Sequence, residues 1–182
     1  MTTMIARPSG ARTKKTTRLA FYVGLKSRND HALIGDRLIC WVTDHWLSHV
    51  ELVESMGTTS LGNVWAWMLS SSLRDGGVRE AWCVLVPSRW VVVEFDGDPC
   101  EAIAYIRGRI GTPYGLLDLL SFLLPFRVSW SGWDFCSEVI SAALRLPKPW
   151  HKSPGNLFDW AMLQPSARIV PDDELLIPWS AS

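Results

Sequence analysis

Cysteine, excess charge and long apolar runs are all scarce in this sequence of 182 residues. Its four cysteines, at positions 40, 83, 100 and 136, show neither the spacing of a zinc site nor the density of a disulfide scaffold, which favours a reducing compartment. Lys plus Arg and Asp plus Glu both number 18, so no net field draws the protein to nucleic acid. The most apolar run, residues 115–126, is well short of the roughly 20 residues that span a bilayer. We therefore expect neither nucleic-acid binding nor stable membrane insertion.

Histidine is scarce as well, with four in the chain. His45 and His49 are four residues apart, which would suit a metal-binding pair on one face of a helix. The alternating pattern of SHVELV instead places His49 on a strand, where the two side chains diverge. We therefore expect no metal and no other cofactor.

Apolar residues are abundant: 48% of the chain is hydrophobic, and 11 residues are tryptophan. This length and composition predict one domain with its own core, over residues 19–163. Residues 1–18 are basic and polar, and we expect a disordered tail or, alternatively, a basic arm that contacts phosphate or lipid. Because no signal-peptide core follows, a cytoplasmic protein or one associated with a phage particle is expected. Residues 164–182 are expected to form an extended strap over the surface.

Short runs rich in β-branched and aromatic residues, separated by turn residues, occupy the first half of the chain. These runs predict an antiparallel meander. The expected strands are residues 19–25, 48–55, 64–72, 78–86 and 90–95. A helix over residues 31–43, capped by Asp30, is expected after the first strand, although LICWV alone would also fit a strand.

Helical patterns dominate after the last of these strands. Asp98 as N-cap, Pro99 at the first helical position and Glu101 two residues later predict a helix start. The expected helices are residues 98–109, 115–124, 134–146 and 154–163, the last capped by Ser153. Strands followed by helices indicate an α+β fold, with an antiparallel sheet packed against a block of helices.

Cys136 is the first candidate for chemistry. It lies in WDFCSEVISAALRLP, where Phe135, Val139 and Ile140 recur at helical spacing and place Cys136 in the first turn. The N–H groups and partial positive charge of a helix N-terminus stabilise a thiolate and could hold the oxyanion of a tetrahedral intermediate. The alternative is a small buried cysteine of the core.

His49 is the second candidate, because an imidazole on a strand could take the proton of a thiol on a facing helix. The strand alternation gives His49 and Glu51 a common face. We predict that the sulfur of Cys136 and a ring nitrogen of His49 lie roughly 3–4 Å apart. A lone strand histidine could also be an ordinary core or surface residue.

Four segments, SHVELV, SSSLRDGGVR, GTPYGLLDLL and WDFCSEVISAAL, occur in an order that resembles the permuted NlpC-type papain-like proteins of bacteria and phages, including the YiiX-like branch. In the unpermuted order the cysteine helix precedes the histidine strand, whereas here His49 comes first. The resemblance implies a papain-like, circularly permuted fold. It also implies that Cys136 is the nucleophile and that His49 is the general base and later the general acid.

The residue that orients the imidazole is left open by the resemblance. Glu51 is preferred to Ser71 of the next strand, although Glu51 could instead bind a substrate amine. Tyr114 could donate to an oxyanion or be an ordinary aromatic residue, and Trp133 could line a substrate groove. Arg79 is expected to form a surface ion pair, or to meet a substrate carboxylate.

Three functions remain open on these grounds. The leading one is hydrolysis of an amide or ester through an acyl-cysteine, with a small peptide, a peptidoglycan-like peptide or an acyl compound as substrate. The second is acyl transfer to an amine or alcohol, as in proteins of the lecithin–retinol acyltransferase type. The third is a non-catalytic binding protein that keeps the fold, because fold alone does not prove activity.

Overall fold

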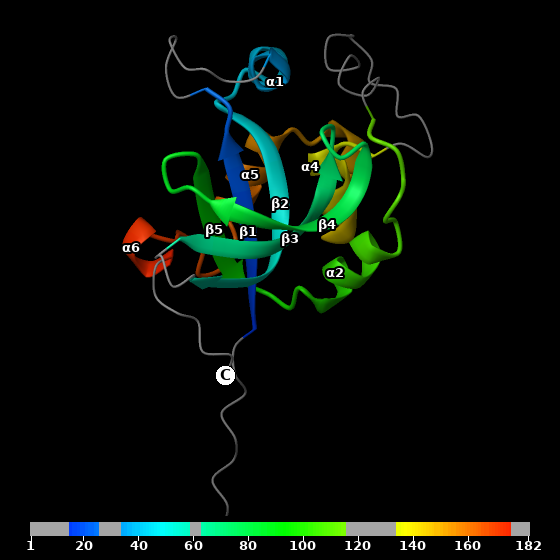
Figure 1. Ribbon diagram of the computed structural model, residues 1–182. Coiled ribbons are helices and arrows are strands. Elements are labelled where there is room, and N and C mark those ends of the chain that lie inside the picture. The colour runs from blue at the N-terminus through cyan, green and yellow to red at the C-terminus, as the bar shows by residue number, and fades with distance from the viewer. Residues whose placement is uncertain (1–14, 26–33, 59–62, 116–133, 176–182) are drawn as a thin grey trace, which may run out of the picture.

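An antiparallel sheet of six strands runs through the middle of the protein (Figure 1). The computed structural model describes residues 15–25, 34–58, 63–115 and 134–175. The strands are β1 (Thr16–Val23), β2 (Leu47–Thr58), β3 (Val64–Ser72), β4 (Gly77–Leu85), β5 (Trp90–Asp96) and β6 (Arg168–Ile169). Their order in the sheet is β4-β3-β2-β1-β5-β6, so β2, β3 and β4 form the expected meander while β5 pairs on the other side of β1.

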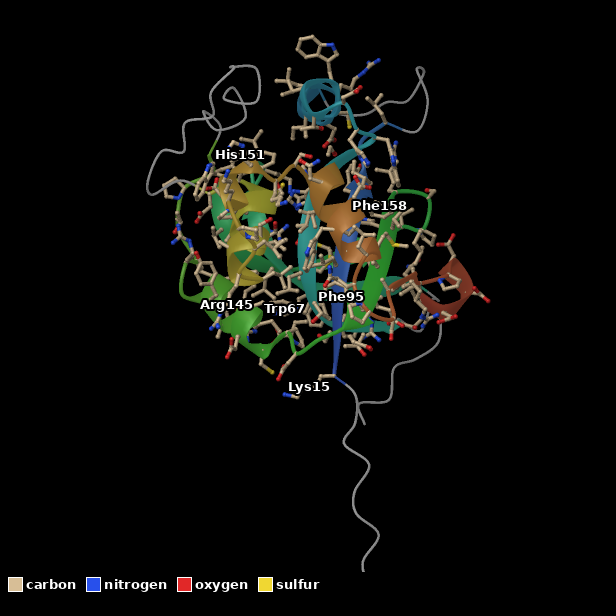
Figure 2. The ribbon with its side chains drawn as sticks, turned by 180° about the vertical axis from the view of Figure 1, so that it is seen from behind. Lys15, Trp67, Phe95, Arg145, His151 and Phe158 are labelled. Carbon is tan, nitrogen blue, oxygen red and sulfur yellow. The ribbon has the colours of Figure 1, made fainter. Side chains whose placement is uncertain are left out.

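The helices follow the sequence patterns closely. They are α1 (Ile34–Thr43), α2 (Cys100–Arg107), α4 (Cys136–Ala143), the short 3-10 helix η1 (Pro149–His151), α5 (Pro154–Met162) and α6 (Asp172–Leu175). Helices α4 and α5 lie side by side over one face of the sheet, as Figure 2 shows from behind. The α+β class with an antiparallel sheet and several helices is therefore confirmed.

A row of apolar side chains crosses the sheet beneath these two helices. Leu19 of β1 pairs with Leu52 of β2 and Val93 of β5, and Leu52 pairs in turn with Leu69 of β3. All four are fully buried. Burial of each such side chain stabilises the fold by roughly 1.5–3 kcal/mol, so this row fixes the register of the central strands.

Helix α5 begins where its capping residues predict. The Ser153 hydroxyl accepts the Asn156 N–H at 3.1 Å, and the Asn156 side chain accepts the Ser153 N–H, which together make a capping box. On the buried side of α5, Phe158 packs edge-to-face on Phe21 of β1, with ring centroids 5.3 Å apart. The cap and this contact together hold α5 against the sheet.

The boundaries of several elements differ from those expected. Strand β1 begins at Thr16, so residues 16–18, expected in the basic tail, belong to the sheet. Helix α2 begins at Cys100, and Asp98 accepts the Cys100 N–H at 3.0 Å, although Pro99 occupies the N-cap position. The expected strap contains β6 and the short helix α6.

Two expectations reach beyond the described residues. Residues 116–124 of the helix predicted over 115–124 lie outside the described residues. The first three residues of the helix predicted over 31–43 also lie outside them. Within the described ranges, no helix is both long and apolar enough to cross a membrane.

Candidate active site

Cys136 is the first residue of α4, as its sequence pattern predicts. The N-cap position before it is taken by Phe135, whose extended backbone turns the chain into the helix and whose apolar ring cannot accept an N–H. Val139 and Ile140 on the next turn are fully buried and hold α4 against the sheet. The sulfur is therefore fixed at the positive end of a helix, in a buried position.

His49 of β2 lies close enough to Cys136 for that side chain to act on the pKa of the imidazole, both through its charge and as a hydrogen-bond partner. The separation of roughly 3–4 Å that we predicted between the sulfur and a ring nitrogen stays a prediction. Cys136 is fully buried, whereas 19% of the His49 side chain is exposed. Burial acts to lower the pKa of the imidazole. The charge and hydrogen bond of Cys136, followed by those of Glu51, outweigh burial and raise this pKa from an ordinary 6.5 to about 10.

Glu51 lies two residues further along β2 and faces the same imidazole. Its Oε1 is 2.9 Å from Nε2 of His49. Both of its oxygens also accept hydrogen bonds from the guanidinium of Arg79 at 2.6 Å, Oε2 from Nη1 and Oε1 from Nη2. Although burial acts to raise the pKa of Glu51, these partners lower it from 4.5 to about 2. Glu51 is therefore a buried, ionised carboxylate that bridges His49 and Arg79.

Arg79 of β4 is the site residue that the sequence did not reveal. We expected a surface ion pair, but only 13% of its side chain is exposed and its main partner is the buried Glu51. Its Nε also donates to Asp75, in the turn before β4, at 2.9 Å. One signal could have indicated this role: a carboxylate expected on a half-buried strand needs a cation. Arg79 follows the Gly76-Gly77 turn on β4, which is separated from the strand of Glu51 only by β3.

Ser71 has a different contact from the one considered for it. Its buried hydroxyl donates to the backbone oxygen of Asp134 at 2.6 Å, just before α4. The carboxylate of Asp134 accepts two hydrogen bonds from Arg109, at 2.8 and 2.9 Å. Ser71 and Arg109 therefore hold the segment that leads into Cys136 and leave the orientation of His49 to Glu51.

Tyr114 is brought close to the candidate nucleophile. It is buried, its ring packs on Phe135 with centroids 5.6 Å apart, and its pKa is raised by burial and then by the negative charges of Cys136 and Asp36. Its backbone joins Asp134 in an isolated parallel bridge. Trp133 lies outside the described residues.

The backbone beside Tyr114 explains the glycine pair of the turn. Thr112 accepts the Val78 N–H at 2.9 Å, and a Cβ on Gly77 would lie 2.1 Å from the Thr112 oxygen. Gly76 has a φ of +81°, which glycine adopts without strain. These contacts bind the loop that carries Tyr114 to the start of β4, near Arg79.

His45 and Cys40 lie apart from this network. Nδ1 of His45 accepts the Leu47 N–H at 3.2 Å, and its ring stacks on Trp46. Cys40 is buried, and burial together with Asp36 raises its pKa to about 11. In the part of the chain that the structure describes, no cluster of three or more His, Cys, Asp or Glu side chains could hold a metal ion.

A cavity of about 280 Å³ lies elsewhere on the sheet, and its lining includes none of Cys136, His49 and Glu51. The residues that line it are Arg18, Met56, Gly57, Glu94, Arg168, Val170, Glu174 and Leu175. Its charged groups neutralise one another, because Arg18 and Arg168 both pair with Glu94. The cavity is therefore separate from the cysteine site.

No known protein-family model matches the chain, and none of the curated proteins matches it.

Proposed function

We propose that this protein is a cysteine hydrolase of the permuted papain-like, NlpC-type class, which cleaves an amide or ester through an acyl-Cys136 intermediate. The observation that carries the proposal is the place of His49 between Glu51, whose Oε1 is 2.9 Å from Nε2, and Cys136, whose side chain acts on the pKa of the imidazole. A nucleophile, a base and a group that orients the base are the three parts of such a site. The order of His49 before Cys136 in the sequence is the further support for the permuted class.

The contacts give each of the three residues a role. Glu51 engages Nε2 of His49, which leaves Nδ1 as the nitrogen that takes the proton of the Cys136 thiol. The sulfur then attacks the carbonyl carbon of the substrate, and N–H groups of the first turn of α4 stabilise the resulting oxyanion. As the tetrahedral intermediate collapses, the bond to the leaving group breaks and His49 passes its proton to that group.

The second half of the reaction regenerates the thiol. His49 takes a proton from water, and the hydroxide formed attacks the thioester carbon. The carbon–sulfur bond breaks, the acid product leaves, and the proton held by His49 returns to the sulfur. Glu51 stabilises the imidazolium in both halves without itself being protonated.

Acyl transfer is the second candidate, because it uses the same acyl-Cys136 intermediate and the same pairing of Cys136 with His49. The two reactions differ only in whether water, or an amine or alcohol, attacks the thioester. Product analysis with and without an added amine separates the two reactions, because only transfer yields the amide.

Competitive alkylation tests the activated nucleophile that both reactions require. We expect iodoacetamide at neutral pH to modify Cys136 faster than Cys40, Cys83 and Cys100, because the thiolate is the form that reacts and His49 can take the proton of Cys136. The modified positions are mapped by peptide mass spectrometry between pH 5 and 9. His49→Asn should slow the reaction at Cys136 alone. Equal rates at all four cysteines in the native protein would contradict the proposal.

A further inference from the structure

We propose that Arg79 is a positioning residue of this site, which keeps Glu51 charged and aimed at His49 so that the imidazolium beside Cys136 persists. This inference rests on the proposed function. Arg79 touches neither Cys136 nor His49 in the contacts described above, and it acts through Glu51 alone. Four observations support this inference. They are the geometry of the two hydrogen bonds from Arg79 to Glu51, the anchoring of Arg79 by other residues, the burial of Glu51 and the charges around Glu51.

The fork between Arg79 and Glu51 fixes the plane of the carboxylate. Two parallel N–H···O contacts of 2.6 Å leave the carboxylate little freedom to rotate. Oε1 takes part in one of these contacts and also meets Nε2 of His49 at 2.9 Å. The direction from which the carboxylate approaches the imidazole is therefore set by the guanidinium.

Arg79 is itself held from a second side. Its Nε donates to Asp75 at 2.9 Å, across the turn that joins β3 and β4. Its backbone pairs with Ser70 in the neighbouring strand β3. The hydroxyl of Ser70 donates to the Val50 oxygen at 2.7 Å, between His49 and Glu51 on β2. Three strands thus place the guanidinium and the carboxylate in one fixed arrangement.

Charge makes Arg79 necessary, because Glu51 is only 1% exposed. The titratable groups that face Glu51 are His49 on its own strand and Arg79 and Cys83 on β4. Arg79 faces Glu51, Asp75 and Cys83, and Arg74 lies beside Asp75. At the other end of the chain of contacts, Cys136 faces His49 and Tyr114.

Removal of Arg79 leaves the imidazole as the sole cationic partner of Glu51 among these groups. A buried carboxylate with one partner binds a proton more readily. Once it is neutral, it no longer stabilises the imidazolium, so Cys136 loses the positive partner that favours its reactive form. The loss should therefore be seen in the pH dependence of Cys136 as well as in stability.

The pH–rate profile of Cys136 alkylation measures this effect. We expect Arg79→Met to move its midpoint up by one pH unit or more, with an approximately tenfold slower reaction on the acidic limb, and Arg79→Lys to recover part of the shift. Arg107→Met is the matched control, because Arg107 pairs with Glu54 of β2 and Glu80 of β4 without reaching His49. A profile of Arg79→Met that superimposes on that of Arg107→Met would overturn the proposal.

A second pair of variants tests whether Arg79 acts through Glu51, and it also covers the case in which Arg79→Met alone does not fold. The double variant Glu51→Gln/Arg79→Met contains no isolated buried carboxylate. We expect its alkylation profile to match that of Glu51→Gln alone. A further shift of a pH unit in the double variant would show that Arg79 acts by another route, and the proposal would be wrong.

One readout separates failure of this inference from failure of the proposed function. Carbon-13 NMR of the Glu51 side-chain carboxyl follows its ionisation without any need for reaction at Cys136. We expect Glu51 to remain ionised at pH 4 in the native protein and to be protonated there in Arg79→Met. If Glu51 titrates differently in the two proteins but Cys136 does not react, only the proposed hydrolase is refuted. If Cys136 reacts but Glu51 titrates alike in both proteins, only the role of Arg79 is refuted.

Discussion

Glu51 is the residue on which the charges of the site converge. Its carboxylate joins the imidazole of His49 to the guanidinium of Arg79. A buried ion pair of this kind is weak evidence for stability, because the cost of removing the charges from water can exceed their attraction. Its presence here is better explained by the need to stabilise a protonated imidazole.

Acid titration should expose the contribution of Glu51 to stability. Its pKa is lowered from 4.5 in the unfolded chain to about 2 in the fold, so its stabilising effect is present above about pH 4.5 and is lost as the pH falls through 2. The effect is on the order of 3 kcal/mol at most. We expect the free energy of unfolding of the native protein to fall toward that of Glu51→Gln over this range, as measured by urea denaturation. A constant difference from pH 6 to pH 2 would contradict this assignment.

The candidate pair could be predicted from the sequence because its signals are local. The helical spacing around Cys136 and the strand alternation around His49 each follow from a few neighbouring residues. Arg79 could not be predicted in the same way, because its role depends on the pairing of β2, β3 and β4, which brings together residues 28 positions apart. Trp133, also selected from the sequence, lies outside the described residues.

At the scale of elements, the approach to α4 is held by contacts from three other segments. The backbone oxygen of Asp134 accepts a hydrogen bond from the Ser71 hydroxyl of β3, and its carboxylate accepts one from the Arg109 guanidinium in the turn after α2. The Asp134 N–H donates to the Pro113 oxygen at 3.0 Å. These contacts decide where the first turn of α4 begins. The strands, most helix starts and the Ser153 cap could be predicted from periodicity and capping, whereas this long-range anchoring could not.

Arg109→Met tests the importance of that anchoring. The Asp134 side chain is 7% exposed and would lose both hydrogen bonds from its cation, so we expect a loss of about 1–3 kcal/mol in the free energy of unfolding. Arg107→Met is the control, because its carboxylate partners are about 30% exposed and surface pairs contribute roughly 0–1 kcal/mol. Both values come from urea denaturation. If Arg109→Met costs no more than Arg107→Met, Asp134 does not anchor the helix.

At the scale of the whole molecule, the cysteine site and the cavity share only one element, β2. The site is built from β2, β4 and the start of α4, whereas the cavity is lined from β1, the far end of β2, β5, β6 and α6. The α+β class followed from the order of strand and helix patterns along the chain. The location of the cavity did not, because it depends on the return of the chain after α5 to pair β6 with β5.

Trapping of an acyl-enzyme tests the central proposal most directly. The protein is mixed with an activated acyl ester, quenched in acid and digested, and its cysteine peptides are measured by mass spectrometry. We predict one acyl group on the peptide that contains Cys136, released by hydroxylamine as a thioester and absent in Cys136→Ala. His49→Asn should slow its formation by roughly 10²–10⁴-fold, because the general base is removed. Acylation that spares Cys136, or that proceeds equally fast in His49→Asn, would contradict the account.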